Sequence, residues 1–106
     1  MIFRGAIYEI KAAPGVKGHE QQGKRLCVII QSDRFASSTM IVALTSASAG
    51  PAIYRPEIDV DGTKTRILCD RIYTVYPSRL GEFKGSLEGD ASAALDRALM
   101  LKLGLL

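Results

Sequence analysis

A polar loop bracketed by glycines leads directly into an apolar strand in the first quarter of the chain. The loop spans residues 18–23 and holds Glu20, and Lys24 and Arg25 join it to the apolar run 26–30. An arginine side chain can bind two phosphate oxygens at once and stays charged at any working pH. We therefore expect an acid and a guanidinium at the end of a buried strand, a combination suited to handling a phosphate group.

A second apolar run, residues 40–44, ends in the hydroxyl side chains of Thr45 and Ser46. A hydroxyl at a strand end can hydrogen-bond a phosphate oxygen and fix the orientation of the group. Together with Glu20 and Arg25, these residues form a metal-free set for phosphate chemistry. Each also has a simpler interpretation: Arg25 as a solvated cation at a strand edge, Thr45 as an ordinary β-branched strand residue, and Glu20 as a residue that shapes the loop.

The cysteines and the single histidine do not follow a metal-binding pattern. Cys27 and Cys69 lie inside apolar stretches, and His19 stands alone in the glycine-rich loop. A structural zinc site needs about four ligands, usually in closely spaced pairs. The sequence therefore predicts no metal or other cofactor and two free, buried thiols. A disulfide would require the fold to bring the two cysteine-bearing strands together.

Length and composition predict one domain over residues 1–106. The hydrophobic fraction of 47% argues against disorder, and the net charge of +3 only slightly favours a polyanionic partner. No apolar run approaches the ~20 residues that span a bilayer, and the amino terminus does not resemble a signal peptide. We expect a cytoplasmic protein with no membrane partner. The small core and the apolar tail, residues 103–106, favour a homodimer, although the tail could instead close the fold.

The elements that must position these groups are mostly strands. Alternation and apolar runs predict strands over residues 2–11, 25–31, 39–44, 57–60, 63–70, 72–76 and 79–87, the last one broken by Gly81 and Gly85. Asp61-Gly62 is a strong hairpin signal. Residues 12–23 and 47–56 are predicted loops that meet above one end of the fold, and the polar segment 32–38 could hold a turn of helix.

The last segment changes to a helical period. Leu95, Leu99 and Leu103 recur at four-residue steps, Asp90 suits the N-cap, and Gly104 suits the position after the last helical turn. The fold class is therefore mainly β with one helix. We expect five to seven short strands in a strongly bent antiparallel sheet or small open barrel, closed by the carboxy-terminal helix.

Five short motifs in chain order carry a resemblance to a known family. They are Arg4-Gly5-x-Ile7-Tyr8, Gly18-x-Glu20-Gln21-x-Gly23-x-Arg25, Leu44-Thr45-Ser46, Ile72-x-Thr74-Val75-x-x-Ser78-Arg79-Leu80-Gly81 and Leu95-Asp96-x-Ala98-Leu99-x-Leu101-x-Leu103-Gly104-Leu105. In this order and spacing the chain resembles the MazF/PemK toxins, ribosome-independent endoribonucleases of toxin–antitoxin systems. The resemblance covers nearly the whole chain.

The resemblance implies a compact SH3-like, CcdB-like barrel that works as a homodimer. It implies metal-independent, sequence-specific cleavage of single-stranded RNA, with attack by the 2′-hydroxyl leaving a 2′,3′-cyclic phosphate and a 5′-hydroxyl. It also implies neutralisation by a cognate antitoxin whose disordered tail covers the RNA groove. The family's catalytic arginine, threonine and loop glutamate fall on Arg25, Thr45 and Glu20.

These three residues have distinct expected roles in that reaction. Arg25 stabilises the extra charge of the phosphorane and Thr45 orients the phosphate. Glu20 is the nearest candidate to accept the proton of the 2′-hydroxyl, with His19 as the other titratable group. The candidate RNA-binding residues are His19, Gln21, Lys24, Ser46, Arg79 and Lys84.

Several of the binding candidates have equally simple alternatives. Arg79 and Lys84 fit surface charges as well as RNA contacts, and His19 fits an exposed loop residue. The tyrosines could stack on unpaired bases or pack within the sheet; they are Tyr54, Tyr73 and Tyr76.

The chain also departs from the family pattern. Leu26 stands where the family often has proline, and residues 71–73 read Arg-Ile-Tyr where the family usually has Gln-Ile-Arg. These departures leave open a degenerate paralogue that has lost activity. Because fold does not fix function, a non-catalytic binding toxin of the CcdB type, which poisons gyrase on the same scaffold, is a separate alternative. The combination of Glu20, Arg25 and Thr45 argues against the binding toxin, because an inhibitor needs no phosphate site.

Overall fold

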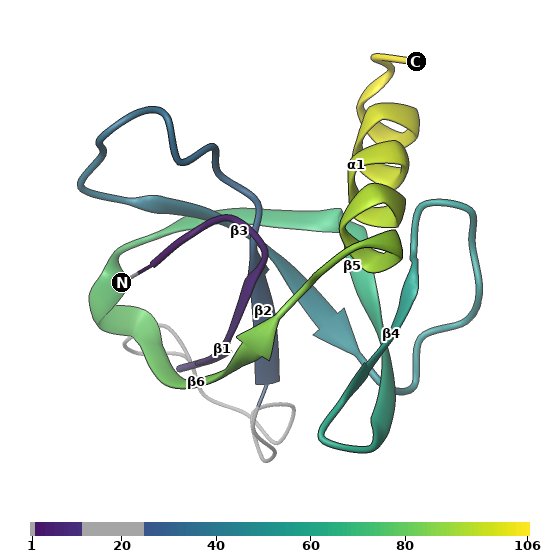
Figure 1. Ribbon diagram of the computed structural model, residues 1–106, viewed down its shortest axis with the longest axis horizontal. Helices are drawn as coiled ribbons and strands as arrows, with labels where there is room; N and C mark the ends of the chain where they lie inside the picture. Colours follow the sequence, from purple (N-terminus) through teal and green to yellow (C-terminus); the bar gives the residue numbers. More distant parts are fainter. Residues whose placement is uncertain (1, 12–24) are drawn as a thin grey trace.

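The computed structural model describes residues 2–11 and 25–106, which form six strands and one α-helix (Figure 1). The strands are β1 (Ala6–Ile10), β2 (Arg25–Ile29), β3 (Met40–Ser46), β4 (Glu57–Val60), β5 (Thr63–Val75) and β6 (Leu80–Ser86). All pairings are antiparallel, in the order β4-β5-β3-β2-β1-β6. Helix α1 (Asp90–Leu103) follows, beside β5. The expected fold class, a bent antiparallel sheet with a carboxy-terminal helix, is confirmed.

The curled sheet buries apolar side chains on both of its faces. One face packs against α1 and forms the helix-side cluster, which includes Val28, Ile67 and Leu95. The other face forms the concave cluster, which includes Ile29 and Val42. Because both faces are covered, β2 and β3 read as continuous apolar runs rather than as alternating ones.

Strand β5 is one long strand, so the prediction of two strands over 63–70 and 72–76 was wrong. Its register with β3 shifts between Ala43, which pairs with Ile72, and Leu44, which pairs with Leu68. The three intervening residues, 69–71, form a bulge that bends β5. Bulges of this kind reorient side chains and are common beside functional sites.

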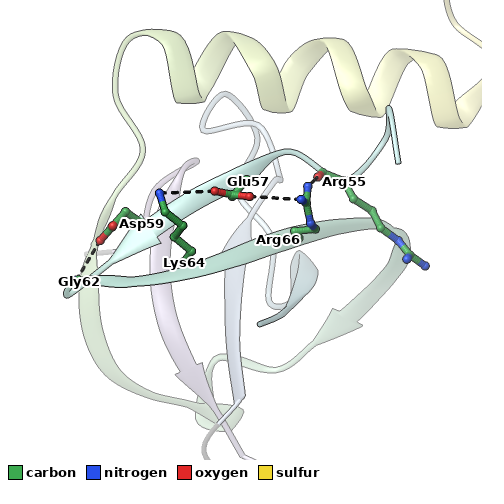
Figure 2. Close-up of polar contacts among 6 residues, drawn as sticks. All are labelled: Arg55, Glu57, Asp59, Gly62, Lys64 and Arg66. Atoms are coloured by element: carbon green, nitrogen blue, oxygen red, sulfur yellow. Dashed lines mark hydrogen bonds and ion pairs between the residues drawn. The ribbon is translucent and has the colours of Figure 1, made fainter. Parts of the chain in front are cut away.

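The β4–β5 hairpin forms at the predicted turn. Asp61 and Gly62 both have positive φ, 52° and 82°, as a two-residue hairpin loop requires. The Asp59 carboxylate accepts a hydrogen bond of 2.9 Å from the backbone N–H of Gly62 (Figure 2). The turn therefore fixes the register of the hairpin.

Helix α1 starts one residue earlier than predicted. The N-cap is Gly89, with φ of 55°, and Asp90 is the first helical residue rather than the cap. Its carboxylate still interacts favourably with the positive end of the helix dipole. Gly104 ends the helix in the left-handed conformation, as predicted. Arg4 ties the helix to the sheet through an ion pair of 2.7 Å with Asp96.

Three smaller predictions also need correction. Residues 31–39 form turns without helix, because Ser37 and Ser32 hydroxyls bond nearby backbone N–H groups instead. Strand β6 is continuous through Gly81 and Gly85, which instead accompany register shifts against β1. The apolar tail does not close the fold, since Leu105 and Leu106 are exposed. The predicted loop 12–23 lies outside the described residues.

The two cysteines are buried on opposite faces of the sheet and are free, as predicted. Cys27 belongs to the concave cluster and Cys69 to the helix-side cluster. Burial raises the pKa of each thiol to about 11, because the thiolate loses its hydration. Since the unfolded chain releases these protons at lower pH, each thiol favours the folded state below pH 9, and this contribution is lost as the pH rises toward 11.

We therefore expect the free energy of unfolding to fall between pH 9 and pH 11. Urea denaturation across this range should show that the free energy of unfolding falls less steeply with pH for Cys27→Ala than for the unmodified chain, even though the variant is less stable overall. Every other titrating group is common to both proteins. The difference between the two slopes of unfolding free energy against pH therefore measures the contribution of the Cys27 thiol. Identical slopes would contradict the assignment.

Candidate active-site cavity

A cavity of about 610 Å³ opens between the ends of β2 and β3 and the β4–β5 hairpin. Its described lining comes from the start of β2, the end of β3 with the segment that follows, and both hairpin strands. The lining residues are Arg25, Leu26, Thr45, Ser46, Ala47, Ser48, Ala49, Arg55, Val60, Thr63, Thr65, Leu68 and Arg71. Among these described lining residues there are three arginines, five hydroxyls and no carboxylate, so the wall suits an anion.

Arg25 and Thr45 meet at this cavity because β2 and β3 pair antiparallel. The pairing of Cys27 with Leu44 brings the first residue of β2 beside the last residues of β3. The Arg25 guanidinium donates a long hydrogen bond of 3.4 Å from Nη2 to the carbonyl oxygen of Thr45. Among the described residues this is the one hydrogen bond of the Arg25 side chain, and it is a weak one, so most of the guanidinium donors are not used by that part of the chain.

The Thr45 side chain is more constrained than its position at a strand end suggests. It is only 4% exposed, and its hydroxyl donates a hydrogen bond of 3.2 Å to the carbonyl oxygen of Leu26. A hydroxyl has one hydrogen to donate. Contact with a phosphate oxygen therefore requires the hydroxyl to turn away from Leu26, at a cost of about 1 kcal/mol, the net value of a typical hydrogen bond.

Ser46 and the segment after β3 add further hydroxyls to the same wall. The Ser46 and Ser48 hydroxyl oxygens lie 3.3 Å apart, and the Ser48 backbone N–H donates to the Ser46 hydroxyl. This local bonding shapes the turn after β3. It places small polar side chains next to Thr45, where a bulky side chain would narrow the cavity.

Two arginines of the lining were not among the sequence-based site candidates. Arg71 lies in the β5 bulge, and Arg55 lies just before β4. Arg55 makes a two-pronged ion pair with Asp70, with distances of 3.1 Å from Nε and 2.8 Å from Nη2 to the carboxylate oxygens. These hydrogen bonds lower the pKa of Asp70 and raise that of Arg55, so both groups stay charged.

The remaining predicted site residues lie elsewhere or outside the described chain. Glu20, His19, Gln21 and Lys24 fall in the segment that the structure does not describe. Arg79 donates hydrogen bonds of 3.1 and 2.6 Å to the backbone carbonyl of Lys11. Lys84 lies within 4 Å of three carboxylates, those of Glu9, Asp61 and Glu82. Neither Arg79 nor Lys84 lines the cavity.

The tyrosines divide between packing and exposure. Tyr54 is partly buried, with the Lys102 amino group 4.1 Å from its ring centre. Tyr73 and Tyr76 are exposed.

Within residues 2–11 and 25–106, no three His, Cys, Asp or Glu side chains gather in a way that could hold a metal ion. The helix in this part of the chain is too short to cross a bilayer.

Comparison with known proteins gives the family. The family model for the PemK-like, MazF-like toxins of type II toxin–antitoxin systems matches residues 3–103. A Mycobacterium tuberculosis protein provisionally named a toxin is 40% identical over 106 residues, covering 99% of this chain and 100% of that protein.

Solved structures show the same fold at lower identity. A mycobacterial endoribonuclease in complex with its cognate antitoxin has a TM-score of 0.80 at 16% identity, covering 100% of this chain and 98% of that one. The MazF toxin of Deinococcus radiodurans has a TM-score of 0.75 at 20% identity, covering 97% and 96%. The family match over residues 3–103 and the 40% identical relative show that this chain belongs to the PemK/MazF family of type II toxins.

Proposed function

We propose that this toxin is a metal-independent endoribonuclease that cleaves single-stranded RNA at the cavity holding Arg25 and Thr45. The observation that carries the proposal is their juxtaposition: a guanidinium with one weak hydrogen bond to the described residues and a strand-end hydroxyl share one open wall whose described part has no carboxylate. An inhibitory binding toxin has no need of such a phosphate-binding wall. The proposed place of action is the cytoplasm, where the RNA is found.

The proposed reaction is an in-line displacement at phosphorus. The 2′-hydroxyl oxygen attacks the phosphorus and loses its proton, the bond to the 5′-oxygen breaks, and that oxygen gains a proton. The products are a 2′,3′-cyclic phosphate and a 5′-hydroxyl. Arg25 faces the oxygens on which charge develops, and its contribution is electrostatic, because a free guanidinium pKa above ~12 makes it a poor base. Glu20 remains our proposed proton acceptor.

Thr45 fits a role in orientation. Its side chain is held firmly by burial, so a hydroxyl rotation alone brings its hydrogen from the Leu26 carbonyl to a phosphate oxygen. A rigidly placed donor fixes the phosphate in line without spending side-chain entropy during the reaction. We place Ser46 beside it as an RNA-binding residue.

The proposed protein partners are a cognate antitoxin and a second copy of this chain. A mycobacterial neighbour of the same fold is an endoribonuclease bound to its cognate antitoxin. An antitoxin segment with acidic side chains would fit the arginine-bearing wall of the cavity. Leu103, Leu105 and Leu106 are exposed, and burying them between two copies would remove apolar area from water.

The proposal predicts cleavage of RNA in the presence of a chelator. Purified protein, freed of antitoxin, would be incubated in EDTA with a mixed-sequence RNA pool and, in parallel, with a DNA pool of the same sequences. We expect discrete RNA fragments and intact DNA, because only RNA carries the attacking 2′-hydroxyl. Intact RNA together with capture of a topoisomerase subunit would contradict the proposal and favour the CcdB-type alternative.

A further inference from the structure

We propose that Arg55 is a specificity residue of this cavity and that it selects guanine beside the cleavage site. The inference rests on the proposed function, since it assumes that RNA occupies the cavity. The observation behind it is the set of hydrogen bonds that the Arg55 guanidinium donates to Asp70 and Gly50.

Contacts within residues 2–11 and 25–106 leave Arg55 two hydrogens for a ligand. The guanidinium carries five N–H hydrogens. Asp70 takes one from Nε and one from Nη2, at 3.1 and 2.8 Å, and the Gly50 carbonyl accepts one from Nη1 at 3.4 Å. The remaining hydrogens lie one on each terminal nitrogen, and the edge formed by Nη1 and Nη2 is the part of the guanidinium that we assign to two adjacent acceptors.

Arg55 differs from Arg25, on the same cavity wall, because a neighbouring carboxylate compensates its charge. The Asp70 carboxylate compensates the Arg55 charge and would repel a phosphate brought close to it. Arg25 has no ion pair within the described residues, so phosphates favour that side of the cavity. A neutral acceptor pair suits Arg55 better. Guanine offers O6 and N7 on one edge, and arginine commonly binds both together.

The fold holds Arg55 firmly in place. Backbone hydrogen bonds from Ile67 to Pro56 and from Cys69 to Tyr54 anchor its segment to β5 on both sides of the residue. The β5 bulge presents Asp70 to it. A donor pair fixed in this way loses little entropy on binding, which is the condition for strong discrimination between bases.

Arg66 on β5 provides a matched control. Both side chains are 25% exposed, and both pair with a carboxylate: Arg66 with Glu57 at 3.2 Å, Arg55 with Asp70 at 2.8 Å. Figure 2 shows that Arg66 bonds to Glu57 and to the Arg55 backbone carbonyl, while the Arg55 side chain extends away from this group. Only Arg55 lines the cavity.

The test compares the cleavage preferences of the full chain and its variants on a random RNA pool. We expect the unmodified protein to enrich guanine at one position next to the cleaved bond, and Arg55→Gln to lose that enrichment. Arg66→Gln should keep it. Because Arg55→Gln leaves the Asp70 charge unpaired and could misfold, the double variant Arg55→Gln/Asp70→Asn is measured alongside it, with the same expected loss.

A second measurement does not require cleavage. Binding of a pool of uncleavable 2′-deoxy oligonucleotides that contain guanine is compared with binding of the same pool made with 7-deazaguanine, an analogue that lacks the N7 acceptor. We expect the analogue to bind the unmodified protein about 3- to 10-fold more weakly, because it keeps O6 and loses one of the two hydrogen bonds from Arg55. The same substitution should change binding to the double variant less than twofold.

The outcomes distinguish this inference from the proposed function. Absence of RNA cleavage by the unmodified protein contradicts the proposed function, and the binding experiment still tests Arg55. Cleavage without guanine enrichment, or enrichment that survives in the double variant, overturns the assignment of Arg55.

Discussion

Replacing Arg25 with alanine is expected to lower RNA cleavage by about a thousandfold or more while leaving the fold intact. Loss of one neutral donor to a developing oxyanion typically costs a factor of 10²–10³, and Arg25 supplies both a charge and several donors. Its one described contact is a hydrogen bond of 3.4 Å to Thr45, so the free energy of unfolding should change by less than about 0.5 kcal/mol. Single-turnover cleavage and urea denaturation measure the two effects.

Two further variants control this result. Arg25→Lys keeps the positive charge but loses the planar pair of donors, so we expect activity between that of alanine and arginine. Arg66→Ala removes a similar charge that does not line the cavity, and it should cleave RNA at nearly the normal rate. Full activity in Arg25→Ala would show that the phosphate is bound elsewhere.

Replacing Thr45 with valine is expected to lower cleavage by about two- to thirtyfold. Valine has nearly the same shape as threonine but has no hydroxyl. A hydrogen bond to a charged group is worth about 1.5–3 kcal/mol, and the hydroxyl gives up about 1 kcal/mol at Leu26 to form it, so the net loss corresponds to this range of rates. Because the hydroxyl also bonds Leu26, the variant should lose about 1 kcal/mol of stability. The rate constant of single-turnover cleavage reports the first effect and urea denaturation the second.

Serine at position 45 separates the two roles of this residue. Thr45→Ser keeps the hydroxyl but removes a buried methyl group. We expect it to lose stability through poorer packing yet to cleave RNA within a few-fold of the unmodified protein. If serine were as inactive as valine, the effect of valine would reflect disturbed packing rather than the lost hydroxyl.

Local signals in the sequence account for most of the fold. The Asp61-Gly62 dipeptide specifies a turn that only a few residue pairs form readily, and the hairpin appears there. The four-residue spacing of Leu95 and Leu99 places one side of α1 on the sheet, and both are buried. These features depend on neighbouring residues, so periodicity and turn chemistry suffice to predict them.

The shape of β5 depends on distant contacts and was missed. The predicted strands ended at Asp70 and began again at Ile72, on either side of the charged residue Arg71. The chain instead continues through a bulge, because Cys69 donates its backbone N–H to Tyr54, fifteen residues earlier. Hydrogen bonds of this kind follow from how the hairpin folds back, and no local pattern encodes them.

The residues of the candidate site likewise include some that local sequence signals predicted and others that depend on distant contacts. Arg25 and Thr45 stood out because each lies at the end of an apolar run, although their proximity depends on the register of β2 and β3. Arg55 was missed because it lies in a predicted loop and owes its position to Asp70. One signal was present, since Asp70 is a charged residue within the most apolar part of β5, where an ion partner is expected.

The most direct test of the central claim is the chemistry of the ends left on RNA cut in the presence of EDTA. Mass spectrometry of the fragments should find a 2′,3′-cyclic phosphate, or its hydrolysis product, on one side of each cut and a 5′-hydroxyl on the other. These ends follow from attack by the neighbouring 2′-hydroxyl at a phosphate held by Arg25 and Thr45. Fragments with 5′-phosphates and 3′-hydroxyls would contradict this mechanism, because they require water to attack the phosphorus instead.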